Sequence, residues 1–147
     1  MTARILVDTN VILYVRDGRF PDKKARCAAW LKALSHSNAM VISPQVAGEH
    51  QLNAQRKLKI ERAEAAEATR GLLRLCTRAT DPADVLRALD IEARWNVAWW
   101  DAMHLSYAVG ASCSHFLTED AQSAPTIEGV RIIDPFRAAP EDILGAA

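Results

Sequence analysis

The sequence predicts an α/β fold in which a mainly parallel sheet is covered by helices on both faces. Short apolar runs such as residues 5–7 and 130–133 are typical of buried strands. Segments with clear helix-start signals lie between such runs, and this alternation favours parallel strands with helices packed on each side. The chain of 147 residues is long enough to bury roughly two thirds of its unfolded surface. We therefore expect residues 1–147 to form a single domain.

The expected elements follow one another without a linker or an internal repeat. A strand over residues 5–7 is followed by a short helix over 11–15, a helix over 22–35 and a strand over 39–42. Ser43-Pro44 and Asp81-Pro82 each place a capping side chain before a proline, which is a helix-start signal. These two helices should reach residues 57 and 94, with another helix over 60–76 between them. A helix over 99–111 and strands over 115–118 and 130–133 complete the prediction.

The charged residues are divided unevenly between the two halves of the chain, although the formal net charge is zero. Residues 1–80 carry 14 basic and 7 acidic side chains, whereas residues 81–147 carry 4 basic and 11 acidic ones. This division excludes a uniformly basic scaffold for nucleic acid. It allows a local basic surface beside an acidic site.

The cysteines and the hydropathy pattern indicate a cytoplasmic protein. Cys27, Cys76 and Cys113 are an odd number without Cys-x-x-Cys spacing, so we expect buried, reduced thiols rather than disulfides or a zinc ribbon. The longest uncharged stretch, residues 102–118, includes His104 and several serines. We therefore expect no membrane span and no secretory signal.

Four carboxylates stand at places where an α/β fold collects ligands. Asp8 follows the first strand, and Asp120 comes just after the strand at 115–118. Asp101 lies in the first turn of the helix at 99–111, and Glu49 lies in the helix that begins after Ser43. Ligands in such folds bind outside the carboxyl ends of the strands. Taken singly, Asp8 and Asp101 could be helix caps, Asp120 a turn former and Glu49 a solvated helix residue.

Taken together, the four carboxylates require a compensating cation. Two carboxylates about 4 Å apart repel by about 4 kcal/mol at an effective dielectric constant of 20. No lysine or arginine lies within two residues of Asp8, Asp101 or Asp120. A hard divalent cation, Mg²⁺ or Mn²⁺, prefers oxygen ligands. Such an ion can activate water and stabilise the charge that develops in phosphodiester cleavage.

The segments that carry these acids resemble the four acidic motifs of the PIN domain, and their order is similar to that of the VapC-type ribonuclease toxins of bacterial toxin–antitoxin pairs. The matching segments are Val7-Asp8-Thr9-Asn10-Val11, Ser43-Pro44-Gln45-Val46-Ala47-Gly48-Glu49, Trp100-Asp101-Ala102 and Leu117-Thr118-Glu119-Asp120. The resemblance covers nearly the whole chain. It implies a PIN-like three-layer α/β/α sandwich with a central, mainly parallel sheet.

The resemblance also implies roles for particular residues and partners. Asp8, Glu49, Asp101 and Asp120 would hold one or two Mg²⁺ ions for RNA hydrolysis. The supporting hydrogen bonds would come from Thr9, Asn10 and Thr118. The expected assembly is a homodimer that is inhibited by a short antitoxin protein.

Two residues depart from the family pattern. Glu119 makes the fourth motif ambiguous, although Asp120 matches the acidic position better. His104, one helical turn after Asp101, stands where the family commonly has an apolar residue. One alternative is that His104 faces the site, and the other, which we favour, is a packed or solvated histidine.

Basic residues in the middle of the chain could contact RNA phosphates. The candidates are Arg56, Lys57, Arg70 and Arg74. The alternative is an ordinary solvated helix face with ion pairs. Asp84, Asp90 and Glu92 are expected to be solvated helix surface in the acidic half.

The interpretation that we favour is a Mg²⁺-dependent endoribonuclease that acts as the toxin of a toxin–antitoxin pair. One alternative is a phosphatase-like enzyme with Asp8 as nucleophile, which is disfavoured because Asn10 replaces the second acid of the usual Asp-x-Asp pattern. Another is a non-catalytic RNA- or protein-binding module on the same scaffold. The sequence has no His-Glu-x-x-His, phosphate-binding Gly-rich loop or Gly-x-Ser-x-Gly motif that would indicate other chemistry.

Overall fold

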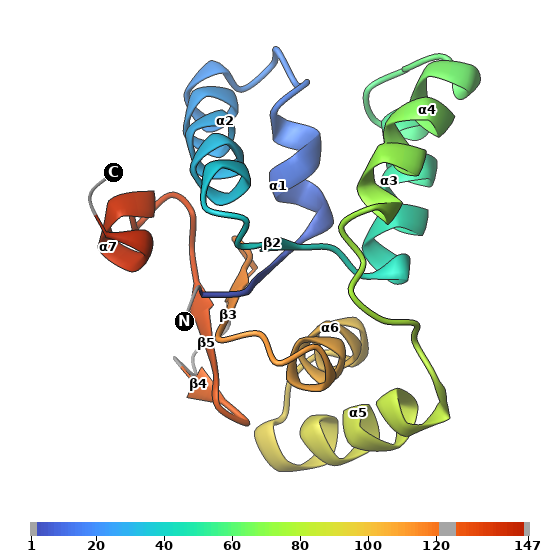
Figure 1. Ribbon diagram of the computed structural model, residues 1–147. Helices are drawn as coiled ribbons and strands as arrows, with labels where there is room; N and C mark the ends of the chain where they lie inside the picture. The colour runs from blue at the N-terminus through green and yellow to red at the C-terminus, as the bar shows by residue number, and fades with distance from the viewer. Residues whose placement is uncertain (1–2, 121–125, 146–147) are drawn as a thin grey trace.

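The structure of the chain, a computed structural model, describes residues 3–120 and 126–145 (Figure 1). The strands are β1 (Ile5–Val7), β2 (Met40–Val41), β3 (His115–Leu117), β4 (Thr126–Ile127) and β5 (Val130–Ile133). The helices are α1 (Thr9–Tyr14), α2 (Pro21–His36), α3 (Pro44–Arg56), α4 (Arg62–Leu73), α5 (Pro82–Trp95), α6 (Trp99–Gly110) and α7 (Pro140–Leu144). These bounds confirm the predicted strands and helices to within a few residues.

The strands form one sheet in the order β2-β1-β3-β5-β4. The pairs of β1 with β2, β1 with β3, and β3 with β5 are parallel. Only β4 runs antiparallel to its neighbour β5 among the described strands. Glu128 and Gly129 connect these two strands with φ values of 50° and 82°, which is the paired left-handed backbone of a tight hairpin turn.

Alternate residues of the central strands point into two separate cores. Ile5 and Val7 of β1 pack in a cluster that includes Trp30 of α2, whereas Leu6 between them packs in a cluster with Leu105 of α6 and Phe116 of β3. Figure 1 shows α1 and α2 on one side of the sheet and α5 and α6 on the other. The predicted three-layer α/β/α arrangement with a mainly parallel sheet is therefore confirmed.

The helix-start signals act as the sequence predicts. The Ser43 hydroxyl accepts a 3.0 Å hydrogen bond from the backbone N–H of Val46, and the Asp81 carboxylate accepts one of 2.8 Å from Ala83. Helix α4 begins later than predicted because Glu61 caps it and the preceding Ile60 packs against a small cluster around Leu13. The short elements β4 and α7 were not predicted, because two and five residues are too few to show a clear period.

The expectation that Asp84 is solvated helix surface is wrong, while Asp90 and Glu92 are exposed as expected. Asp84 is fully buried and accepts hydrogen bonds from the guanidinium groups of Arg78 (2.6 Å) and Arg87 (3.1 Å). Its carboxylate also accepts a bond from the backbone N–H of Asp81, which completes a capping box at the start of α5. The two arginines satisfy a buried charge that would otherwise be costly.

The three cysteines are free, and Cys27 and Cys113 are buried as the sequence predicts, whereas Cys76 is only partly buried. Burial raises the pKa of Cys27 to about 12 and that of Cys113 to about 11, so both remain protonated at neutral pH. In the described part of the chain, none of the helices combines the length and the apolar character needed to span a membrane.

Candidate active site

Asp8 lies at the carboxyl end of β1, at the point where the chain turns into α1. Its carboxylate caps α1 by accepting a 2.7 Å hydrogen bond from the backbone N–H of Thr9. The other oxygen, Oδ2, accepts a 2.7 Å bond from the hydroxyl of Thr118. Val7 and Leu117 are register partners in parallel strands, so the residues that follow them emerge side by side. Asp8 is therefore buried, 7% exposed, and fixed through both of its oxygens.

Glu49 reaches the same place from α3. The Thr9 hydroxyl donates a 2.5 Å hydrogen bond to Oε2 of Glu49, and the Gln45 amide donates one of 3.0 Å to Oε1. Gln45 precedes Glu49 by one helical turn, so α3 itself orients the carboxylate. The side chain of Glu49 remains one third exposed, which leaves it open to solvent and substrate.

Asp101 and Asp120 complete the acidic cluster. Burial raises the pKa of Asp101, and the negative charges of Asp8, Asp120 and Glu49 raise it further. Burial and the charge of Asp8 likewise raise the pKa of Asp120, while Lys57 and Lys23 oppose the rise. These mutual effects follow from like charges held close together. Asp101 and Asp120 thus lie near enough to Asp8 for their charges to act on one another.

His104 is packed, as the sequence predicts, and it also faces this cluster, which is the alternative that the sequence left open. Its ring is 4% exposed, and Nε2 lies 3.8 Å from Oδ1 of Asp8 and 3.7 Å from Oε1 of Glu49. Nδ1 is buried and has no hydrogen-bond partner within the described residues. Because Asp101 and His104 are one turn apart on α6, a helix that presents the first residue to the site also presents the second. The spacing of one helical turn from Asp101 was therefore the sequence feature that could indicate a position of His104 at the site.

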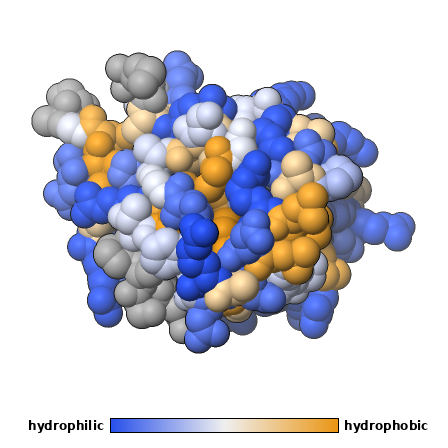
Figure 2. Space-filling view, turned by 90° about the horizontal axis from the view of Figure 1, so that it is seen from below, coloured by the Kyte–Doolittle hydropathy of each residue, from blue (hydrophilic) through white to orange (hydrophobic). Residues whose placement is uncertain are grey.

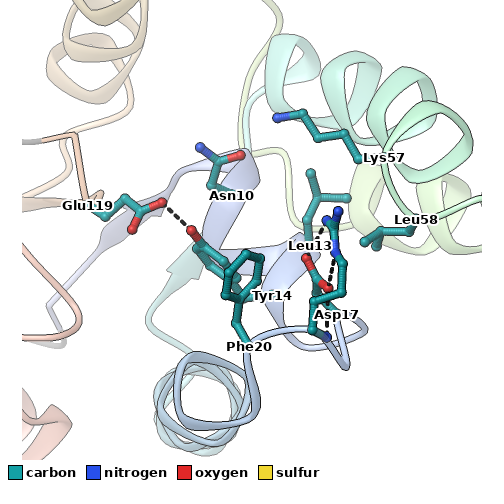
Figure 3. Close-up of a pocket in the computed structure, with 9 residues that line it drawn as sticks. Asn10, Leu13, Tyr14, Asp17, Phe20, Lys57, Leu58 and Glu119 are labelled. Atoms are coloured by element: carbon teal, nitrogen blue, oxygen red, sulfur yellow. Dashed lines mark hydrogen bonds and ion pairs between the residues drawn. The ribbon is translucent and has the colours of Figure 1, made fainter.

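Glu119 belongs to a neighbouring network rather than to the four acids. Its carboxylate accepts a 2.5 Å hydrogen bond from the Tyr14 hydroxyl and a 3.0 Å bond from the Lys23 ammonium. Within the part of the chain that the structure describes, the side chain of Asn10 makes no hydrogen bond, and it lines the same pocket as Glu119 and Tyr14 (Figure 3). Thr9 and Thr118 therefore hold the acidic cluster by hydrogen bonds, whereas Asn10 lies beside it.

The residues present fit a divalent metal ion. One ligand atom each from Asp8, Glu49 and His104 lie within 4.8 Å of one another. Carboxylate oxygens suit Mg²⁺ and Mn²⁺, and an imidazole nitrogen suits the transition metals. Burial, followed by the negative charges of neighbouring acids, raises the pKa of Asp101 and of Asp120, so both groups lie where added positive charge would be favourable. A divalent cation would supply it.

The four candidate RNA-binding residues lie at different places. Lys57, the residue that ends α3, lines the pocket beside the site and acts on the pKa of Asp120. Arg70 pairs with Glu67 at 3.2 Å on an exposed face of α4. Arg56 and Arg74 are also exposed, near the ends of α3 and α4. Lys57 is thus linked to the acidic cluster, and RNA contact by Arg56, Arg70 and Arg74 stays a prediction.

Acidic side chains at the carboxyl edge of a mainly parallel sheet define an α/β protein with a candidate metal site. The sequence model of the PIN domain matches residues 5–125. The chain belongs to the PIN-domain family, a family of nucleases.

The solved structures that share this fold include two bacterial complexes. One is a toxin–antitoxin complex from Klebsiella pneumoniae, with 18% identity and a TM-score of 0.61 over 89% of this chain and 97% of that chain. The other is VapBC2 from Rickettsia felis bound to a DNA fragment from its promoter, with 14% identity and a TM-score of 0.61 over 88% and 96% of the two chains. The search of curated proteins found no match.

Proposed function

We propose that this chain is a metal-dependent endoribonuclease, with Mg²⁺ or Mn²⁺ as the metal, and that it is the toxin of a toxin–antitoxin pair. The observation that carries the proposal is the convergence of Asp8, Glu49, Asp101 and Asp120 at the carboxyl ends of β1 and β3 and the adjoining helices. Membership of a nuclease family supports the chemistry. The fold shared with toxin–antitoxin complexes supports the biological role.

In this proposal Asp8 and Asp101 are the principal metal ligands, and Glu49 and Asp120 complete the site. The bound metal would polarise the scissile phosphate and lower the pKa of a water molecule. Hydrogen bonds from the Thr118 hydroxyl and the backbone N–H of Thr9 fix the orientation of the Asp8 carboxylate. Glu49, fixed by Thr9 and Gln45 but open to solvent, is placed to orient the attacking water and to accept its proton on a carboxylate oxygen.

The phosphatase-like alternative fits the geometry less well. Both oxygens of Asp8 accept 2.7 Å hydrogen bonds, which hold the carboxylate in one orientation. The second acid of a phosphatase-like site would stand at position 10, where this chain has Asn10. Among the described residues, the Asn10 amide donates no hydrogen bond to any of the four acids. The same surroundings suit a carboxylate that serves as a fixed metal ligand.

The decisive experiment incubates the protein with single-stranded RNA and, separately, with a phosphomonoester, in Mg²⁺, Mn²⁺ or EDTA. We expect RNA cleavage in the metals alone, and a loss of about a hundredfold or more in Asp8→Asn and Asp101→Asn. Asp90→Asn, an exposed acid of α5, is the matched control and should cleave like the wild type. RNA cleavage that survives EDTA or both active-site substitutions would contradict the metal-carboxylate mechanism, and phosphomonoester hydrolysis alone would favour the phosphatase.

The antitoxin and the homodimer are part of the same proposal. Val85, Leu86 and Leu89 on α5 are 40%, 65% and 49% exposed, and Figure 2, which views the molecule from below Figure 1, shows hydrophobic groups among charged ones on this face. An exposed apolar helix face of this kind supports self-association. Light scattering should give a dimer for the wild type and a monomer for Leu86→Glu. Growth arrest on induction, relieved by a co-expressed antitoxin, tests the toxin role.

A further inference from the structure

We propose that the pocket beside the acidic cluster binds one unpaired nucleotide of the RNA, with its base against Phe20 and its phosphate at Lys57. This inference rests on the proposed ribonuclease function and specifies how the substrate is held. The pocket has a volume of about 280 Å³, at the small end of the range for ligand pockets. It is therefore suited to a single nucleotide rather than to a folded RNA element.

The position of the pocket joins it to the carboxylates. Asn10, which lines the pocket, is two residues after Asp8, and Glu119, which also lines it, lies between Thr118 and Asp120 (Figure 3). The same two chain segments thus supply the acidic cluster and the pocket wall. A nucleotide bound in the pocket would place the next phosphodiester of the strand at the carboxylates.

Phe20 offers an aromatic surface that is already held in place. The residue precedes α2 and is 45% exposed, although burial of a phenyl ring is favourable. The Tyr14 ring meets it edge to face at 6.0 Å and 87°, and the Arg19 guanidinium lies 5.5 Å from its centroid. Unpaired RNA bases stack on such rings, and a ring that is already oriented loses little entropy on binding.

Lys57 is the pocket cation best placed for a phosphate. Arg19 is engaged by Asp17 through bonds of 2.9 and 2.8 Å, and Lys23, beside the pocket, is engaged by Glu119 at 3.0 Å. Within residues 3–120 and 126–145 the Lys57 ammonium has no ion-pair partner, and Figure 3 shows it extending toward Asn10. Its charge also reaches Asp120. A phosphate between the pocket and the acidic cluster would therefore lie next to this ammonium.

The test measures RNA binding separately from cleavage. All proteins carry Asp101→Asn and are held in EDTA, and the probe is a fluorescein-labelled, unstructured RNA octanucleotide followed by anisotropy. The variants are Phe20→Ala, Phe20→Trp and Lys57→Ala. The matched controls are Leu73→Ala, which also removes an exposed apolar side chain, and Lys32→Ala, which removes an exposed lysine further along α2. Circular dichroism checks that each variant is folded.

We expect Phe20→Ala to weaken RNA binding by about tenfold and Phe20→Trp to restore it. Lys57→Ala should weaken binding several-fold and reduce the slope of log affinity against log salt by about one. The controls should bind within about twofold of the parent.

Binding by Phe20→Ala and Lys57→Ala that equals the controls would overturn the pocket proposal. If these variants bind RNA normally but lose a co-expressed antitoxin, a protein segment occupies the pocket instead, which also overturns it. Cleavage of RNA by the otherwise unmodified protein in Mg²⁺ is measured in parallel. If the protein cleaves RNA in either of these two outcomes, only the pocket proposal has failed. If it does not cleave RNA, the proposed function has failed.

Discussion

The Thr118 hydroxyl donates a 2.7 Å hydrogen bond to Oδ2 of Asp8, and both residues are almost fully buried. The bond joins the ends of two adjacent parallel strands, 110 residues apart in the chain. It fixes which way the carboxylate faces. Thr118 also accepts a 3.2 Å bond from the backbone N–H of Asp120, so one hydroxyl orders two of the four acids.

We expect Thr118→Val to lower the rate of RNA cleavage by about ten- to a hundredfold, as loss of a partner to a metal ligand commonly does. Valine keeps the shape but removes the hydroxyl, so Asp8 loses one hydrogen bond and Asp120 loses its anchor. Thr118→Ser should retain most of the activity. The measurement is the cleavage rate together with the Mg²⁺ dissociation constant from calorimetry. Equal rates for Thr118→Val and the wild type would show that the hydroxyl does not position the site.

The acidic cluster should make the metal-free protein less stable as the pH rises. The pKa values of Asp101 and Asp120 are raised in the folded chain, so the folded state binds extra protons between the ordinary aspartate pKa, about 3.9, and the raised values. Stability from these two groups is therefore present at low pH and falls as the pH passes through that window.

Asp101→Asn should remove this penalty. In EDTA at neutral pH its Tm should exceed that of the wild type by about 2–4 °C, the shift given by about 1 kcal/mol in a domain of this size, and the difference should vanish near pH 4. Thermal unfolding at several pH values, with and without Mg²⁺, provides the measurement. Mg²⁺ should raise the Tm of the wild type much more than that of the variant. A lower Tm for Asp101→Asn in EDTA would contradict this account.

The sheet edge could be predicted from the sequence because it depends on local rules. Asp8 and Asp120 follow short apolar runs, and parallel strands bring their carboxyl ends together wherever the helices lie. Ser43 and Asp81 start their helices through bonds to residues two or three positions away. Such features need no knowledge of tertiary packing.

The orientation of His104 and the burial of Asp84 could not be predicted with the same ease, because both depend on how α5 and α6 pack. Two features of Asp84 predict an exposed residue: its charge and its place in the first turn of a helix. Its burial depends on Arg78, which lies before the helix and reaches back to it. The one local sign was the spacing of Asp84, Ala88 and Ile91, which share the buried face of α5.

Asp84 should be essential for stability and unimportant for chemistry. Asp84→Ala would leave Arg78 and Arg87 without their buried partner, so we expect a loss of about 3–5 kcal/mol in the free energy of unfolding. Burial raises the pKa of Asp84, but the bonds from Arg78 and the Asp81 backbone outweigh it and the pKa is lowered. This stability is therefore present above about pH 4 and is lost as the pH falls further.

Urea unfolding measures the effect of Asp84→Ala, with Asp90→Ala on the exposed face of the same helix as the matched control. Asp90→Ala should change the free energy of unfolding by less than about 0.5 kcal/mol. The RNA cleavage rate per folded molecule should be unchanged in both variants. If Asp84→Ala has the same free energy of unfolding as Asp90→Ala, the buried ion pairs of Asp84 contribute nothing to stability.

His104 should influence which metal the site prefers. Its Nε2 lies within 3.8 Å of a carboxylate oxygen of both Asp8 and Glu49, so an ion bound by these acids would lie close to the imidazole. Nitrogen ligands favour Mn²⁺ and later transition metals relative to Mg²⁺. We therefore expect His104→Leu to weaken Mn²⁺ binding more than Mg²⁺ binding and to lower Mn²⁺-supported cleavage by about tenfold or more.

Calorimetry with each metal and Mn²⁺ electron paramagnetic resonance separate this effect from packing. Leucine fills much of the space beside Phe116, whose ring centroid lies 5.5 Å from that of His104, so the fold should persist and the Tm should change little. A spectrum of bound Mn²⁺ that shows coupling to ¹⁴N in the wild type and none in His104→Leu would establish the nitrogen ligand. If both metals bind the variant as they bind the wild type, His104 serves only to fill the core behind the carboxylates, and the preference of the site for its metal must come from the four acids alone.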